Sequence, residues 1–173
     1  MSVVNNGNLV TKVYFPREIL PLSTAGAAFF DLLMSALVFV ILMIIYKTPL
    51  SLNLLYLLII IPSFVLITTG ISFIFSAINV LFRDVRFVVP LLLQIWFFLT
   101  PVIYSASQVP QKYQIIFKVN PLVSLIENFR TVTIYAKSPN VGDILLYFFV
   151  SAFIFIAGYW FFKHNEKIFA DVM

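Results

Sequence analysis

Four long apolar stretches restrict what this chain can fold into. They cover residues 24–46, 53–79, 87–104 and 144–162, and a charged residue occurs only in the first, at Asp31. Because an α-helix rises about 1.5 Å per residue and the hydrocarbon core of a bilayer is about 30 Å thick, stretches of this length can cross it. Charged residues make up 10% of the chain, which is too few to cover the surface of a soluble domain. The sequence predicts an all-α integral membrane protein, a single membrane domain with four transmembrane helices.

The residue types that are missing exclude several kinds of chemistry. The chain has no cysteine and one histidine, His164, so a disulfide framework, a thiolate nucleophile and a metal cluster are not expected. No glycine is followed by Lys-Ser or Lys-Thr, so the phosphate-binding loop of an ATPase is not expected either. The net charge is +4, but the basic residues form no stripe that would suit nucleic acid. We predict no catalytic residue, no metal, no cofactor and no nucleic-acid partner.

The region between the third and fourth stretches, residues 105–143, is neither a plain loop nor a span. Asn120-Pro121 marks a helix start, because asparagine caps helices and proline suits their first turn. An amphipathic helix of about 14 residues should follow, too short to cross a membrane. It carries Glu127 and Arg130, which can pair at i,i+3. A re-entrant helical hairpin fits this pattern best, and a helix lying on the membrane surface is the alternative.

The distribution of charge suggests an orientation. Arg83 and Arg86 share one tight loop, and Lys163 and Lys167 follow the last span. Because basic residues close to spans favour the cytoplasmic side, we place both termini inside, with residues 163–173 as a cytoplasmic tail. Residues 105–143 are then extracytoplasmic.

Several motifs carry a family resemblance that runs along almost the whole chain. They are NLVTKVYFPREILPL at 8–22, NVLFRDVR at 79–86, Pro90 with Gln94, LTPVIY at 99–104, Val109-Pro110, Asn120-Pro121, Phe129-Arg130 and FADV at 169–172. In this order they resemble landmarks of bacterial type-2 ATP-binding-cassette exporter permeases, which move polysaccharides and polyol phosphates. Members are usually longer, with two more spans before the first motif, so this chain looks like the C-terminal part of such a permease.

The resemblance implies a transport subunit in the bacterial inner membrane. A separate ATP-binding-cassette ATPase subunit would supply the energy, and a homodimer of the permease would enclose the path. The substrate would be a lipid-linked polysaccharide or a teichoic-acid-like polyol phosphate polymer. Membrane lipids would be further partners of the chain. The alternative is a truncated remnant or a structural subunit that transports nothing.

The same resemblance implies that residues 1–23 form a cytoplasmic segment with a short coupling helix that meets the ATPase. Its candidate residues are aromatic or charged, with one proline among them: Lys12, Tyr14, Phe15, Pro16, Arg17 and Glu18. The alternative is an interfacial anchor, which the same side chains would serve. The loop with Arg83, Asp84 and Arg86 could contact the ATPase or lipid headgroups, or could only anchor the chain through its positive charge.

Candidate channel or gate residues lie within and between the later spans. Asp31 lies about 12 Å along the first predicted span, away from its middle; it could line the path, join an intersubunit network or make a packing contact. Trp96 and Tyr104 could stack on sugar rings or belong to an aromatic belt at the interface. Asn120, Pro121, Glu127 and Arg130 belong to the predicted hairpin and would form an outer gate.

Overall fold

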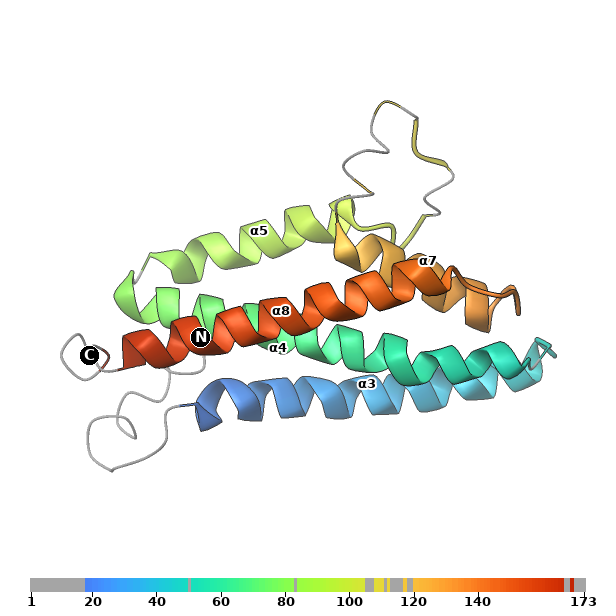
Figure 1. Ribbon diagram of the computed structural model, residues 1–173, viewed down its shortest axis with the longest axis horizontal. Helices are drawn as coiled ribbons and strands as arrows, with labels where there is room; N and C mark the ends of the chain where they lie inside the picture. The colour runs from blue at the N-terminus through green and yellow to red at the C-terminus, as the bar shows by residue number, and fades with distance from the viewer. Residues whose placement is uncertain are drawn as a thin grey trace.

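Every regular element in the described part of the chain is helical. The computed structural model describes residues 18–49, 51–82, 84–104, 108–110, 112, 117, 120–166 and 169. The elements of Figure 1 are α3 (Ile19–Ile45), the 3-10 helix η1 (Leu52–Tyr56), α4 (Leu57–Leu81), α5 (Val85–Leu99), α7 (Pro121–Thr133) and α8 (Val141–Asn165). The all-α prediction is therefore confirmed for these residues.

Within the described residues, three helices are long and apolar enough to cross a membrane. They are α3, the continuous stretch Leu52–Leu81 formed by η1 and α4, and α8. They correspond to the predicted spans 24–46, 53–79 and 144–162, which are thereby confirmed as long apolar helices. α3 begins at Ile19, so residues 19–23 of the predicted coupling segment belong to this helix.

The helix in the third predicted span, α5, is shorter than expected. It has 15 residues, about 22 Å of helix, and stops at Leu99 instead of continuing to Tyr104. Thr100 has an extended backbone, with φ −106° and ψ 127°, because the ring of the following Pro101 disfavours the helical conformation in the residue before it. A fourth single-helix span is therefore not seen, and the count of four crossings stays a prediction.

The long helices lie side by side: α4 and α8 run in the same direction and α3 runs in the opposite one, while α5 lies apart from α3 across α4 (Figure 1). The closest pair is α4 and α8, which cross at two glycines. A Cβ atom added to Gly70 would lie 2.7 Å from the backbone of Phe155, and one added to Gly158 would overlap the Gly70 carbonyl oxygen. The missing side chains therefore allow the two backbones to touch, as small residues do in membrane helix pairs.

Two small apolar cores hold the ends of the bundle together. At the end that carries Glu18 and Lys163, called the near end below, a cluster joins α3, α4, α8 and Phe169, which follows α8: Leu20, Phe73, Ala77, Val80, Phe162 and Phe169. At the opposite far end, Ile60, Val132 and Ile144 join α4, α7 and α8. These cores fix the ends of the helices relative to one another.

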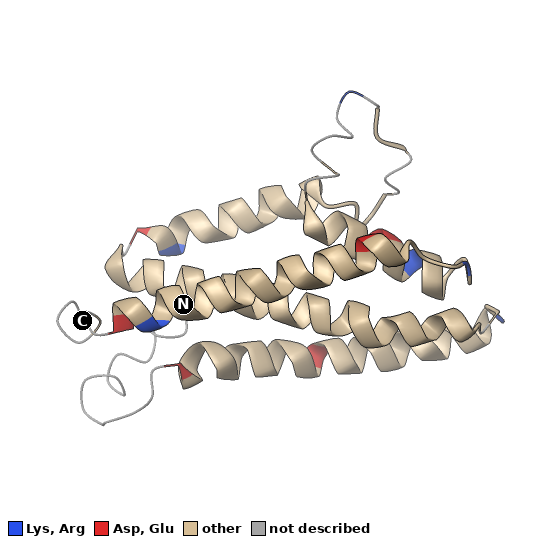
Figure 2. Ribbon diagram, viewed as in Figure 1, with Lys and Arg blue, Asp and Glu red and all other residues tan. Residues whose placement is uncertain are grey.

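Most large apolar side chains face outward, away from these cores. α5 has no buried residue, and in α3 only Leu20, Pro21 and Met43 are buried. In water such a surface would be very unfavourable, whereas lipid or further protein accommodates it. Charged residues of the described part gather toward the two ends of the bundle, apart from one acidic position along α3 (Figure 2).

Candidate functional site

The chain returns to the end of α5 before α7 begins. The side-chain nitrogen of Asn120 donates a hydrogen bond to the Thr100 hydroxyl at 3.2 Å, and Thr100 is buried at 4% exposure. Thr100 in turn donates to the carbonyl oxygen of Trp96 at 2.9 Å. The start of α7 is therefore fastened to the last turn of α5, 20 residues earlier in the chain.

The predicted helix start at Asn120-Pro121 is confirmed. The Asn120 side-chain oxygen accepts a hydrogen bond from the Leu122 amide at 3.1 Å, and Pro121 occupies the first helical turn. The helix that follows has 13 residues, close to the length predicted, and buries Leu125 and Val132 as its apolar spacing indicates.

Arg130 binds backbone as well as its predicted partner. The pair with Glu127 is confirmed, with 3.1 Å between Arg130 Nη1 and Glu127 Oε1. The guanidinium also donates to the carbonyl oxygens of Val102, at 2.6 Å, and Tyr104, at 2.9 Å. These carbonyls follow the break at Pro101 and have no helical partner, so a buried or lipid-facing position requires a donor from elsewhere. Arg130 therefore ties the segment after α5 to α7.

A groove of about 360 Å³ lies between α4, α5 and the start of α7. Its lining is apolar apart from two threonines: Phe64, Thr68, Ile71, Leu93, Trp96, Phe97, Thr100, Val102, Leu122 and Ile126. Of the two candidate aromatic residues, Trp96 borders this groove. Tyr104 donates its hydroxyl hydrogen to the Phe98 carbonyl oxygen at 2.7 Å, so its polar end is bound to the chain itself.

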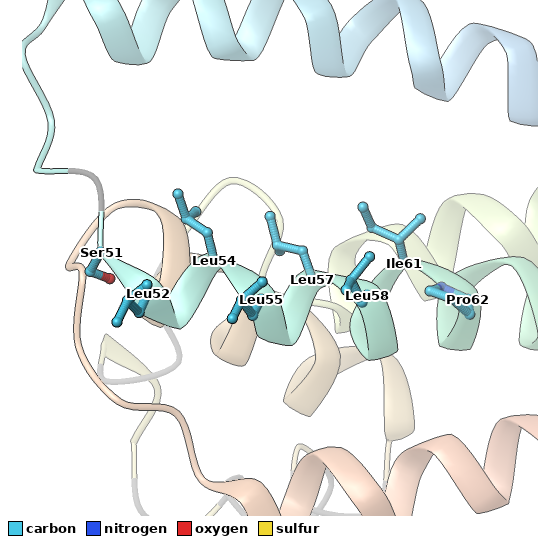
Figure 3. A pocket seen from close by; sticks show the side chains of 8 residues that line it. All are labelled: Ser51, Leu52, Leu54, Leu55, Leu57, Leu58, Ile61 and Pro62. Carbon is cyan, nitrogen blue, oxygen red and sulfur yellow. The ribbon is translucent and has the colours of Figure 1, made fainter.

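A second groove, of about 490 Å³, lies at the far end on η1 and the first turns of α4 (Figure 3). Its lining is apolar except for one hydroxyl: Ser51, Leu52, Leu54, Leu55, Leu57, Leu58, Ile61 and Pro62. With no charged group and strongly exposed leucines, such as Leu52 at 86%, this surface suits acyl chains better than a polar polymer.

Asp31 lies near the middle of α3, because this helix begins five residues before the predicted span. The helix starts at Ile19 and ends at Ile45, so about 18 Å of helix precede Asp31 and about 21 Å follow it. The residue is exposed, and within the described ranges no hydrogen-bond or ion-pair partner is present. A carboxylate at this depth is costly against lipid, so this face of α3 needs a polar neighbour.

The near end of the bundle holds a small polar cluster around Glu18. Its Oε2 atom accepts hydrogen bonds from the Tyr159 hydroxyl at 3.0 Å and from Lys163 Nζ at 3.2 Å. Lys163 Nζ also lies 2.7 Å from Glu166 Oε2. Of the candidate coupling residues, Glu18 is thus placed by contacts that connect the start of α3 to the end of α8.

Of the remaining candidate residues, the structure describes Asp84 and Arg86. Lys12, Tyr14, Phe15, Pro16, Arg17 and Arg83 lie outside the described residues. Asp84 is exposed just before α5, and the Arg86 guanidinium stacks over the Phe87 ring, 4.7 Å from its centroid. In the described part of the chain, Asp84 and Arg86 form no ion pair, and no group of acidic or histidine side chains could hold a metal ion.

Two asparagines at the far end were missed in the sequence. Asn128, 7% exposed, accepts a hydrogen bond from the Asn140 amide at 3.1 Å, and so links α7 to α8. Asn140 also caps α8 through Gly142 and Asp143. The cap could have been recognised from an asparagine just before an apolar run, whereas nothing in the sequence marks the link to Asn128.

The sequence matches the protein family described as "ABC-2 type transporter" over residues 1–134. This chain belongs to that family of membrane transport proteins. Two proteins of Klebsiella pneumoniae, each named O-antigen export system permease protein RfbA, are 28% and 30% identical to it over 99% of its length. A protein of the same name from Myxococcus xanthus is 26% identical over 98% of it. The chain spans 66% of the length of each of these relatives. The resemblance drawn from the motifs is therefore confirmed.

Proposed function

We propose that this chain is the membrane part of an ATP-driven exporter of a lipid-linked polysaccharide, of the O-antigen class, in the bacterial inner membrane. The observation that carries the proposal is the similarity to O-antigen export permeases over nearly the whole chain. Export of a teichoic-acid-like polymer would use the same membrane architecture and differ in the substrate.

The ATP would be hydrolysed by a separate ATP-binding-cassette subunit. The stretch that includes Lys12, Tyr14, Phe15, Pro16 and Arg17 would contact that subunit from the cytoplasm, with the Arg83 to Arg86 loop beside it. Two copies of the permease, related by a two-fold axis, would enclose the path for the polymer, because the few helices of one chain cannot surround it. The unburied faces of α5 are consistent with such a shared surface.

The outer side of the path would be formed by the region from Thr100 to Thr133. A hydrogen bond joins Thr100, at the end of α5, to Asn120, just before α7. This contact supports a re-entrant hairpin in which the chain leaves α5 and returns to the end of the same helix. In this arrangement α5 and α7 share the third crossing, and Glu127 and Arg130 lie near the external exit. Both ends of the chain then lie in the cytoplasm.

Deletion of the gene in its own bacterium tests the proposal. We expect loss of the polysaccharide from the cell surface and accumulation of its lipid-linked form inside, measured on isolated surface and membrane fractions. Restoring the gene should reverse both effects. Unchanged surface polysaccharide would contradict the proposal and favour a membrane subunit without a transport role.

A further inference from the structure

The last helix, α8, contacts both regions that the proposed function assigns to moving parts. At the near end, Lys163 and Tyr159 bind Glu18, the residue that directly follows the coupling stretch in the chain. At the far end, the first residue before α8, Asn140, binds Asn128 of α7. The helix between these contacts runs along most of the bundle (Figure 1).

The last third of α8 packs closely against α4. Backbone meets backbone at Gly70 and Gly158, and the Phe73 ring packs edge-on against Tyr159, with 5.5 Å between the ring centroids. Packed helices of this kind move as rigid bodies and do not bend continuously. A displacement applied to one end of α8 would therefore reach its other end.

The contacts at Glu18 differ from the neighbouring ion pair in what they connect. Glu18 to Lys163 and Glu18 to Tyr159 join two helices that are far apart in the sequence. Lys163 to Glu166 joins residues one turn apart within the end of α8. Of these three polar contacts, only the first two connect the start of α3 to α8.

We propose that Lys163 and Tyr159 are positioning residues that transmit the movement of the coupling segment, through Glu18, to α8 and from there to α7. The proposal rests on the proposed function and adds to it a named connection between the ATPase side and the outer hairpin. In this proposal α8 couples movement on the ATPase side of the transporter to movement of the outer hairpin.

The test uses the natural permease in complex with its ATPase, reconstituted in proteoliposomes, and measures polymer exported per ATP hydrolysed. Lys163→Met and Tyr159→Phe should each lower this ratio about threefold, the size of effect expected when a partly exposed polar contact between two helices is lost. Binding of the ATPase and membrane insertion should be unchanged. Tyr159→Phe keeps the ring packed on Phe73, so it also serves if Lys163→Met folds poorly.

The matched control is Glu166→Gln, which removes the other carboxylate partner of Lys163 without touching the link between helices, and should leave the ratio near that of the wild type. In the Glu166→Gln background, Lys163→Glu alone should lower the ratio, and the addition of Glu18→Lys, which completes the exchange of charges, should restore it. If Lys163→Met and Tyr159→Phe behave like Glu166→Gln, α8 does not transmit the movement and this inference is wrong. If the wild-type complex itself exports no polymer, the proposed function fails and this inference with it.

Discussion

Replacement of Gly158 by alanine is the sharpest test of how this bundle is held together. The added Cβ would overlap the Gly70 carbonyl oxygen, which is backbone and cannot rotate away. The two helices would have to separate or slide along the part of the fold where they pack most closely. Gly70→Ala should act in the same way, because its nearest neighbours are backbone atoms of Ile154 and Phe155 at 2.7 Å.

The size of the effect follows from two opposing contributions. Overpacking of a tightly packed contact costs about 1–3 kcal/mol, while alanine is preferred to glycine inside a helix by about 1 kcal/mol. The free energy of unfolding should therefore fall by about 1 kcal/mol in Gly158→Ala. Gly26 provides the matched control, since it lies in a helix with nothing within 4 Å of an added Cβ. Gly26→Ala should raise the free energy of unfolding by up to about 1 kcal/mol.

The assay is reversible unfolding of the purified protein in mixed detergent micelles, followed by far-ultraviolet circular dichroism. The free energies of unfolding of Gly158→Ala and Gly26→Ala should differ by about 2 kcal/mol, with Gly158→Ala the less stable. If Gly158→Ala is as stable as Gly26→Ala, the close backbone contact between α4 and α8 is not present in the protein.

Three further predictions concern the hairpin, α3 and the orientation. Arg130→Leu should lower the free energy of unfolding by about 2 kcal/mol, because it leaves two backbone carbonyls without a donor. Unfolding in the same micelles measures this, and an unchanged value would show that the hydrogen bonds from Arg130 to these carbonyls do not stabilise the fold. Asp31→Leu should impair export while Asp31→Asn keeps most of it, because an amide still offers hydrogen bonds to a polar neighbour; equal export by both variants would make this polar group dispensable. Since the chain has no cysteine, single cysteines can report sidedness: one at Ser138 should react with an impermeant thiol reagent in intact cells and one at Lys167 should not, and the reverse pattern would overturn the orientation.

The long helices could be predicted because their signal is local and repeated. An uncharged run such as 53–79 needs no tertiary information to be recognised, and the start of α7 follows from Asn120 and Pro121 alone. The pair between Glu127 and Arg130 could also be anticipated, because it depends only on helical spacing.

Contacts between distant segments could not be predicted in this way. The binding of Arg130 to the carbonyls of Val102 and Tyr104 depends on how the chain turns back after Pro101. The link from Glu18 to Lys163 joins residues 145 positions apart. Composition and periodicity carry no information about which helix ends meet, so these contacts required the fold.

The boundary of α5 shows a different limit. Hydropathy favoured a continuous span to Tyr104, because Val102 and Ile103 are as apolar as the helix before them. The backbone nevertheless leaves the helix at Thr100, since the proline that follows disfavours the helical conformation there. Proline geometry therefore outweighed apolar length in setting this boundary.

ATP-dependent movement of polysaccharide across a membrane would show directly whether this chain belongs to an exporter. The natural permease and its ATPase, reconstituted in proteoliposomes with the lipid-linked polymer of the same bacterium, should move the polymer to the opposite side only while ATP is hydrolysed, and a non-hydrolysable ATP analogue should stop the movement. Polymer that stays on its original side during ATP hydrolysis, with both subunits correctly inserted and bound, would contradict the account.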